Sequence, residues 1–543
     1  MLSNKLQLTL RDRKVLAALC ALILVTALFS VFIGYQLGAN AQSSTLTMQT
    51  HSGGPNSGAP TYTIFKENSV CYAKDAYGAI AFSSTNAEVV LQNTIGSNRK
   101  VMVQPGDYLI DDKLLIDQVV NFELFGTVGS SRIYTTQDEE IFVIARSSSI
   151  HIHDLKLEGD SNAAKTQQTG ISIYDTVYNT VIENCIISGL GYDGINILFG
   201  ANGTRIINNY VLNCGDDGIN PGGGGATPTL NTIVANNYVS GSGGDGIHVS
   251  EDSLFTTVIG NHVDNVGEDG IGIYNSTSNI IDGNIINSPG KRGIVAKYNA
   301  GPYQTIVNNQ IYDSGEQGIF LAYDSHHSII SGNTIKNPTG YAINLEGNAL
   351  TDITVTNNIV SVASRGIYGN VNNSRIEGNS FAGITQYGIA LVGGATYGNN
   401  SIIGNSFSGT FSADVIYLTE THCIISNNKC NVVGSSYSVN EDTGGNFNFI
   451  TNNDMAKGSL GGYRRTGANS IVSMNFGYFV RGTAAISSGN VVAVSFSLAA
   501  APNIVTLGAN GNVTAWFSDL TANGMNLHAP DGYSVSYFAE YSP

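Results

Sequence analysis

The sequence predicts an all-β protein whose main part is a parallel β-helix, and two repeated signals carry this prediction. Gly-Ile pairs recur with one period between Gly170 and Gly388. An asparagine returns every 21 to 28 residues, at Asn184, Asn209, Asn237, Asn261, Asn284, Asn309, Asn333, Asn358, Asn379, Asn405, Asn428 and Asn453. The composition agrees, because 64 glycines and only 11 prolines suit many short strands joined by tight turns.

Each period contains short alternating segments, such as Thr204–Ile207 and Tyr210–Leu212, separated by Gly and Asn. The physical solution is a coil of three short strands, with roughly 12–14 such coils stacked in parallel at about 4.8 Å. Inward Ile and Val then stack on their equivalents, while Asn tolerates left-handed turns and can hydrogen-bond along the stack. A propeller is the main alternative, but its blades need about 40 residues each.

The N-terminal segment predicts a membrane anchor. Residues 1–14 form a basic cytoplasmic segment, and Val15–Ile33 is an apolar run of 19 residues, long enough to cross a bilayer. We therefore expect a transmembrane anchor at 15–37, with the rest of the chain on the extracellular side, and a flexible stalk at 38–60. The alternative is a signal peptide cleaved near Ala39-Asn40-Ala41, which would make the protein secreted.

The rest of the chain divides into three predicted regions. Residues 61–112 are expected to form an N-terminal cap and first coil, because Asn86–Ile95 has the pattern of a short amphipathic helix. The parallel β-helix follows at 113–465. In residues 470–543 the Asn repeat has ended, and the alternating segments Val491–Phe496 and Tyr533–Phe538 predict a small antiparallel β-domain.

Charge and cysteine content exclude some functions. A formal net charge of −16 argues against nucleic acid as a partner, since no basic patch exists to neutralise phosphates. No spacing of His and Cys predicts a zinc site, and six cysteines are few for an exported chain, so the fold should not depend on disulfides. Cys430 takes an inward position beside Phe407 and Met455 and is expected to be an inert core thiol.

Alignment of the coils on Gly-Ile places acidic residues in one column. The residue before the glycine is Asp193, Asp217, Asp245, Asp269 and then Arg292. Like charges at intervals of about 4.8 Å repel, so raised pKa values, a bound cation or Arg292 would have to compensate. Carboxylates on adjacent coils would lie near the roughly 5 Å separation of retaining glycosidases, and those two coils apart near the roughly 9.5 Å of inverting enzymes.

The repeat resembles the pectin-lyase-like, right-handed parallel β-helix superfamily over roughly residues 80–465. The order of polar motifs is similar to that of polygalacturonase-type glycoside hydrolases, which place Asn-Thr-Asp, Asp-Asp, Gly-His-Gly and Arg-Ile-Lys on successive coils. Asp193 falls at the first motif and Asp216-Asp217 match the second. His248, in Gly-Ile-His-Val, and Lys291-Arg292 with Lys297 depart from the last two. The resemblance implies that the three aspartates supply general acid and base, and that Lys297 or Arg292 holds a substrate carboxylate.

We therefore expect a membrane-anchored cell-surface protein that binds or cleaves an extracellular polysaccharide on its Asp193–Lys297 face. The candidate catalytic residues are Asp193, Asp216, Asp217, Asp245 and His248, and the candidate substrate-binding residues are Asp269, Tyr274, Arg292 and Lys297. No cofactor is required, although a lyase variant would use a Ca²⁺ held by the aspartates, with Arg292 or Lys297 as base. The alternative is a non-catalytic stalk or adhesin that displays the C-terminal domain, in which each Asp only caps its own turn.

Overall fold

The computed structural model describes residues 58–543, apart from short gaps at 163, 223, 225–226, 251, 299, 435–436, 456–460, 466–468, 476–478, 486–490, 496–503, 510–514, 522–523, 530–533 and 541–543. The predicted cytoplasmic segment, the anchor at 15–37 and the stalk up to residue 57 lie outside the described residues. Within the described ranges, no helix is both long and apolar enough to cross a membrane.

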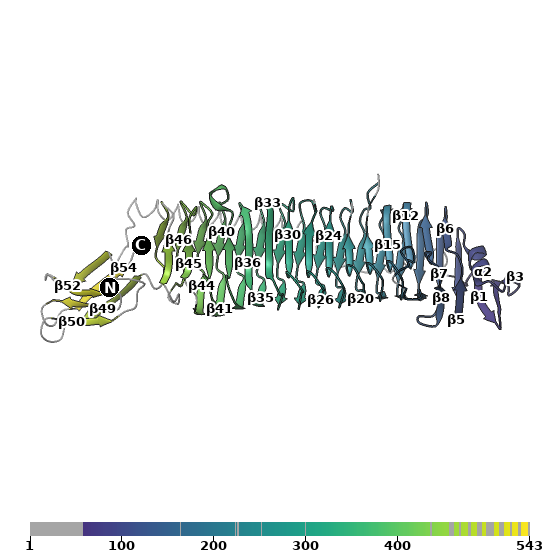
Figure 1. Cartoon of the computed structure of the whole chain (residues 1–543), viewed down its shortest axis with the longest axis horizontal. Coiled ribbons are helices and arrows are strands. Elements are labelled where there is room, and N and C mark those ends of the chain that lie inside the picture. The colour runs from purple at the N-terminus through teal and green to yellow at the C-terminus, as the bar shows by residue number, and fades with distance from the viewer. Residues whose placement is uncertain are drawn as a thin grey trace, which may run out of the picture. The chain divides into compact units, whose positions relative to one another are not determined.

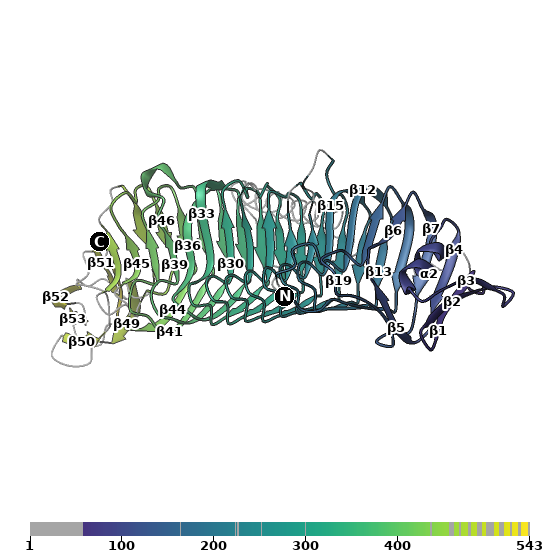
Figure 2. The same ribbon diagram turned by 45° about the vertical axis from the view of Figure 1, so that its right-hand side comes forward.

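The main part of the chain is a parallel β-helix with three strands per coil (Figure 1 and Figure 2). One coil consists of β15 (Ile195–Asn202), β16 (Arg205–Ile207) and β17 (Tyr210–Leu212). One sheet contributes 14 strands, from β5 (Gly106–Ile110) to β44 (Lys429–Val433), and the other two strand columns belong to one large sheet. The predicted architecture is therefore confirmed, but the strand column from β6 (Leu114–Asp117) to β47 (Gly461–Arg465) contains 15 strands, one more than the upper estimate of 14 coils. Strand β48 (Ile471–Ser473) carries the stack past residue 465.

The interior is filled by aliphatic side chains stacked in register. Ile206, Val234 and Val258 lie opposite one another on three successive coils and are fully buried. A buried side chain of this size contributes roughly 1.5–3 kcal/mol to the free energy of unfolding, relative to its exposed state. Because the same positions are filled in successive coils, each coil adds a similar amount of stability to the stack.

One corner of each coil buries an asparagine whose amide continues along the stack. Asn237 Oδ1 accepts from the backbone N of Asn209 at 2.9 Å, and Asn237 Nδ2 donates to Asn261 Oδ1 at 2.9 Å. The residue before each buried asparagine takes the left-handed turn, as Asn208 and Asn236 do with φ of 58° and 56°. Turning and hydrogen bonding are therefore divided between two adjacent residues.

The first and last members of this asparagine ladder differ from the prediction. Asn184 has a φ of 51° and belongs to the outer, left-handed series, so its assignment to the ladder was wrong. Cys185 holds the buried place, and its backbone N donates to Asn209 Oδ1 at 2.9 Å. At the other end the ladder extends to Asn475, whose Oδ1 accepts from the backbone N of Asn453 at 2.9 Å.

The N-terminal cap contains the predicted helix, α2 (Ala87–Thr94), which Asn86 caps by accepting from the Glu88 N at 2.9 Å. Three antiparallel strands that the sequence did not predict precede it, β1 (Tyr62–Glu67), β2 (Val70–Asp75) and β3 (Ile80–Ser84). Strand β1 pairs in parallel with β4 (Arg99–Val103), so the first coil does not present an open strand edge.

The C-terminal residues form the predicted antiparallel domain, built from two three-stranded sheets. The first consists of β49 (Phe479–Ala485), β54 (Ser534–Glu540) and β51 (Ile504–Ala509). The second consists of β50 (Val491–Ser495), β53 (Gly524–His528) and β52 (Trp516–Thr521). Met525, Leu527, Ala529 and Val535 form its own buried cluster, separate from the core of the β-helix.

The five described cysteines are free and buried. Cys430 lies in register with Phe407 and is fully buried, as predicted for a core thiol. Burial raises the pKa of the Cys185 thiol to about 12, which keeps it protonated and unreactive.

The asparagine ladder predicts a sharp difference between adjacent residues. Asn309→Ala removes the acceptor of the Asn284 backbone N at 3.0 Å and leaves that buried N–H without a partner. We expect a loss of about 1–3 kcal/mol in the free energy of unfolding for each orphaned group, measured as a lower Tm by circular dichroism. The control Asn308→Gly alters the left-handed turn residue, which glycine suits, and should unfold like the wild type. Equal effects of the two substitutions would contradict the division of roles.

Candidate functional site

The predicted acidic column exists and is set by the register of the strands. Ile219, Ile247, Ile271 and Ile294 face one another on successive coils, at the starts of β18 (Ile219–Pro221), β21 (Ile247–Val249), β24 (Ile271–Tyr274) and β27 (Ile294–Lys297). Asp217, Asp245 and Asp269 stand two positions before the first three of these isoleucines, and Arg292 stands two before Ile294. Asp193 has the same place before Ile195, which pairs with Ile219. The alignment made from sequence therefore places the aspartates on one face as expected.

One oxygen of each aspartate is used to hold the next coil. The backbone N of Asp217 donates to Asp193 Oδ1 at 3.0 Å, and that of Asp245 donates to Asp217 Oδ1 at 2.7 Å. The series continues from Asp269 to Asp245 and from Arg292 to Asp269, both at 2.9 Å. The four carboxylates are 0 to 6% exposed. This aspartate ladder is a structural element in its own right.

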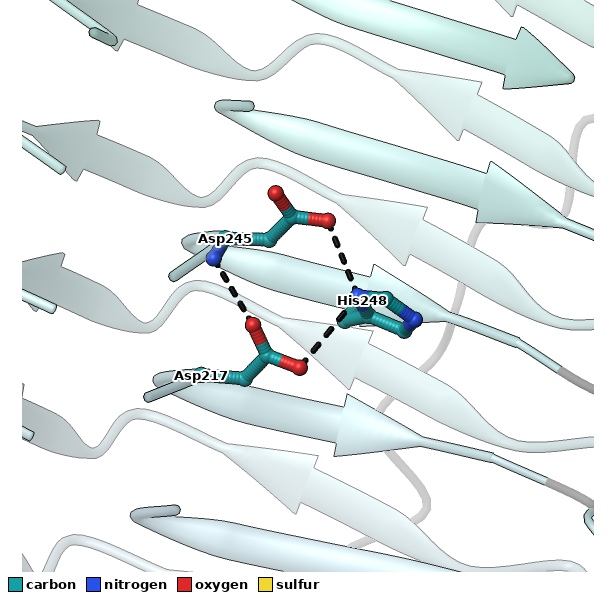
Figure 3. Close-up of side chains that lie close together, drawn as sticks. All are labelled: Asp217, Asp245 and His248. Atoms are coloured by element: carbon teal, nitrogen blue, oxygen red, sulfur yellow. Dashed lines mark hydrogen bonds and ion pairs between the residues drawn. The ribbon is translucent and has the colours of Figure 1, made fainter. Parts of the chain in front are cut away.

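The second oxygens of the ladder face other functional groups. His248 Nδ1 lies 3.2 Å from Asp217 Oδ2 and 2.9 Å from Asp245 Oδ2, so both carboxylates hold the same ring nitrogen (Figure 3). Asp269 Oδ2 accepts from the Tyr274 hydroxyl at 2.6 Å. Asp193 Oδ2 is buried and has no hydrogen-bond partner among the described residues. Each aspartate thus combines one oxygen that holds the next coil with a second oxygen that the ladder does not use.

Burial and mutual repulsion make the carboxyl groups of the aspartate ladder, together with His248, retain protons. Burial raises the pKa of Asp193 to about 7 and the pKa of Asp217 to about 8, and neighbouring carboxylates add to both shifts. Burial alone would lower the pKa of His248, but Asp245 and Asp217 outweigh it and raise that pKa to about 9. Near neutral pH the imidazole is therefore charged, and the cluster holds protons that free carboxylates would have lost.

An aromatic line continues from His248 along the same face. The Tyr274 ring lies 4.5 Å from the His248 ring, Tyr298 lies 6.1 Å beyond, and Tyr323 a further 6.5 Å. Tyr298 is 61% exposed and Tyr323 is 44% exposed. These two tyrosines were not predicted from the sequence, although both directly follow the strand that starts at Gly-Ile, in adjacent coils.

The two predicted cations have different environments. Arg292 is 8% exposed, donates from Nε to Asp269 Oδ1 at 2.9 Å and lies 3.7 Å from Glu316 Oε2, so it terminates the aspartate ladder. Lys297 Nζ lies 4.7 Å from the Tyr298 ring centre and 5.2 Å from that of Tyr274. Among the described residues Lys297 has no ion-pair partner, and it is therefore the cation that is available to a ligand.

Asp216 and the possible metal ligands complete the site. Asp216 is more accessible than Asp217, and burial is the main cause that raises its pKa, against the lowering effect of His248. Asp217, Asp245 and His248 present ligand atoms within 4.8 Å of one another. Two carboxylates and an imidazole suit a transition metal better than Ca²⁺, which prefers oxygen ligands throughout. Any such ion would have to displace the proton on His248 Nδ1.

Comparison with known families identifies the repeat. The family model described as right handed beta helix region matches residues 130–297 and 245–407, which together span residues 130–407 of 543. No curated protein matches the sequence.

Several solved structures are similar to this chain at low sequence identity. The tailspike protein gp49 from Pseudomonas phage LKA1 is 11% identical, with a TM-score of 0.43 over 84% of this chain and 92% of that one. The catalytic unit of a GH87 α-1,3-glucanase from Streptomyces thermodiastaticus is 17% identical, with a TM-score of 0.42 over 64% and 66%. The tailspike protein of E. coli bacteriophage HK620, in complex with a pentasaccharide, is 12% identical, with a TM-score of 0.42 over 86% and 92%.

The proton-holding cluster predicts that stability falls as pH rises. Asp193, Asp217 and His248 all have raised pKa values, so the folded state binds more protons than the unfolded chain between about pH 4 and 9. Asp217→Asn should flatten this decline in Tm, because it removes one of these protons. Burial also raises the pKa of the core residue Glu420 to about 8. Part of the decline in Tm with pH should therefore remain in the Asp217 variant. The exposed control Asp313→Asn should leave the pH profile of Tm unchanged, and identical profiles for both variants would contradict the assignment.

Proposed function

The chain belongs to the right-handed β-helix family, and we propose that it binds an extracellular polysaccharide on its Asp193–Lys297 face and hydrolyses it by proton transfer. The observation that carries this proposal is the position of His248 Nδ1 between two buried carboxylates, beside an exposed line of tyrosines. The predicted anchor at 15–37 would hold this face outside the cell, and cleavage near Ala39-Asn40-Ala41 would instead release it.

His248 is the proposed general acid. Asp217 and Asp245 hold its Nδ1 and keep the ring charged, while the side chain remains 27% exposed and its Nε2 is directed away from both carboxylates (Figure 3). A group whose pKa lies near or above the working pH can donate a proton to the leaving glycosidic oxygen. Asp217 and Asp245 act as positioning residues, because they set the orientation and charge of the ring.

Asp216 is the proposed general base. It belongs to the coil before His248 and is the more accessible member of the Asp216-Asp217 pair. It would take a proton from water as the water oxygen bonds to the sugar carbon, while His248 gives its proton to the departing oxygen. The two transfers balance, and the pair is restored when the base returns its proton to solvent and the acid takes one up.

Substrate binding is assigned to the aromatic line and Lys297. Tyrosine rings offer flat apolar surfaces with a polar edge, which suit the faces of sugar rings in a water-exposed groove or platform. Lys297 has no carboxylate partner among the described residues and would contact a polar or anionic substituent of the sugar.

A second candidate function, a non-catalytic adhesin, is favoured by the structural use of one oxygen in every ladder aspartate.

Removal of the acid tests the catalytic proposal directly. His248→Gln should lower the release of reducing ends from a panel of purified polysaccharides by about 100- to 10,000-fold, because general acid catalysis typically contributes that much. The matched control His327→Gln alters an exposed histidine that stacks on Tyr303 and should leave the rate unchanged. Wild-type rates in the His248 variant would refute proton transfer. Glycan binding by the wild type without any turnover would instead support the adhesin.

The positioning role of Asp217 makes a separate prediction about pH. Asp217→Asn removes one of the negative charges that raise the pKa of His248, so that pKa should fall. Because the acid works in its protonated form, the alkaline limb of the kcat/KM profile should move to lower pH. Asp313→Asn should keep the wild-type profile. An unshifted limb with reduced kcat would show that Asp217 acts on the substrate in another way.

A further inference from the structure

The column that carries the aspartates continues beyond Arg292 and changes its chemistry. The strands that follow are β30 (Ile319–Ala322), β33 (Tyr341–Thr351), β36 (Arg365–Asn372) and β39 (Ile389–Leu391). Tyr341 faces Arg365 directly, and the pairing of Ile367 with Ile389 places Tyr387 next in the same column. The acids of the first coils are thus replaced by tyrosines and a cation on the same face.

Arg365 lies among three tyrosine rings. Its guanidinium carbon is 4.5 Å from the ring centre of Tyr368, 4.6 Å from that of Tyr341 and 5.7 Å from that of Tyr387. Nη1 donates to the Tyr341 hydroxyl at 2.6 Å, and Nε donates to Gln386 Oε1 at 2.9 Å. These contacts fix the orientation of the guanidinium group without neutralising its charge.

No carboxylate neutralises Arg365 among the described residues, although the chain as a whole has a net charge of −16. Arg132, Arg146, Arg292 and Arg375 all form ion pairs with carboxylates. An oriented guanidinium without an anion, beside half-buried aromatic rings, has the geometry that binds carboxylates and other oxyanions through two parallel hydrogen bonds.

We propose that Arg365 with Tyr341, Tyr368 and Tyr387 forms a second glycan subsite, which binds a sugar unit bearing a carboxylate or sulfate. The guanidinium group binds the oxyanion, and the tyrosine rings contact the sugar ring. The inference rests on the proposed function in one respect, namely that the ligand of this face is a polysaccharide. It defines that polysaccharide as anionic.

The spacing of Lys297 and Arg365, which both lack a carboxylate partner in the described part of the chain, indicates a long ligand. Ile294, Ile319, Ile343 and Ile367 are successive partners in register, so the coil of Lys297 and that of Arg365 are three steps apart. At about 4.8 Å per step this is roughly 14 Å along the β-helix axis. Lys297 stands three positions after Ile294, whereas Arg365 stands two positions before Ile367, so the two cations are also offset across the face. A glycan that contacts both must therefore be an extended chain of several sugars that crosses the coils obliquely.

Binding to matched polymers tests the Arg365 subsite. We would measure the Kd of the full chain for dextran, carboxymethyl dextran and dextran sulfate of equal length, in the His248→Gln background so that cleavage does not interfere. An anionic polymer should bind more tightly than dextran, and Arg365→Gln should weaken that binding roughly 10-fold or more, with dextran unaffected. The matched control Arg375→Gln removes the same charge from the same coil, on another strand, and should bind like its parent.

The outcomes separate the subsite from the catalytic proposal. Tighter binding of carboxymethyl dextran alone identifies a carboxylate ligand, and tighter binding of dextran sulfate alone identifies a sulfated one. Equal losses in the Arg365 and Arg375 variants, or equal Kd values for all three polymers, would overturn the subsite. Arg365→Lys, which keeps the charge but not the guanidinium group, should bind between the wild type and Arg365→Gln, and its Tm checks that the coil is intact. A wild-type protein that never cleaves any glycan would refute hydrolysis and leave these binding results standing.

Discussion

The rest of the structure depends on one constraint, which is that each coil buries polar corners that only its neighbouring coils can satisfy. Asn237 shows how this is met, because its amide accepts from the coil before and donates to the coil after. A buried amide group without a partner would cost about 1–3 kcal/mol, which cancels the contribution of about one buried aliphatic side chain. The period of the repeat, the parallel register and the positions of all surface residues follow from that ladder.

The ladder also explains what could be read from the sequence. The Asn period marks the buried corner of each coil, and the Gly-Ile period marks the start of one inward-facing strand. These two periods therefore predict the architecture, the three strands per coil and the alignment of Asp193 to Arg292. The doublet Asn184-Cys185 misled the assignment, because an outer turn asparagine and an inner ladder asparagine have the same letter. Strands β1 to β3 were missed because a three-stranded antiparallel meander lies outside the repeat of the coils and occurs only once.

The column in which the site residues lie could be predicted from the sequence, but the burial of each side chain could not. Register gives the face on which a residue lies, and this placed Asp217, Asp245 and His248 together. It does not tell how far a side chain is buried or which partner it chooses, so the commitment of Arg292 to Asp269 and the freedom of Lys297 appear only in three dimensions. Tyr298 and Tyr323 were missed for a related reason: each stands five residues after the glycine of Gly-Ile, directly beyond the end of its strand, where strand alternation no longer gives the direction of the side chain.

The two ladders differ in one chemical respect, and that difference accounts for the site. An asparagine both donates and accepts, so a stack of asparagines satisfies itself and can be repeated without limit. A carboxylate only accepts, so each aspartate in the stack leaves one oxygen that the ladder cannot satisfy. A donor must come from elsewhere, and the structure supplies His248, the Tyr274 hydroxyl and, where neither reaches, a retained proton on Asp193. Replacing asparagine chemistry by aspartate chemistry in a buried column therefore collects protons and proton donors on one face, which is the first requirement for acid–base work there.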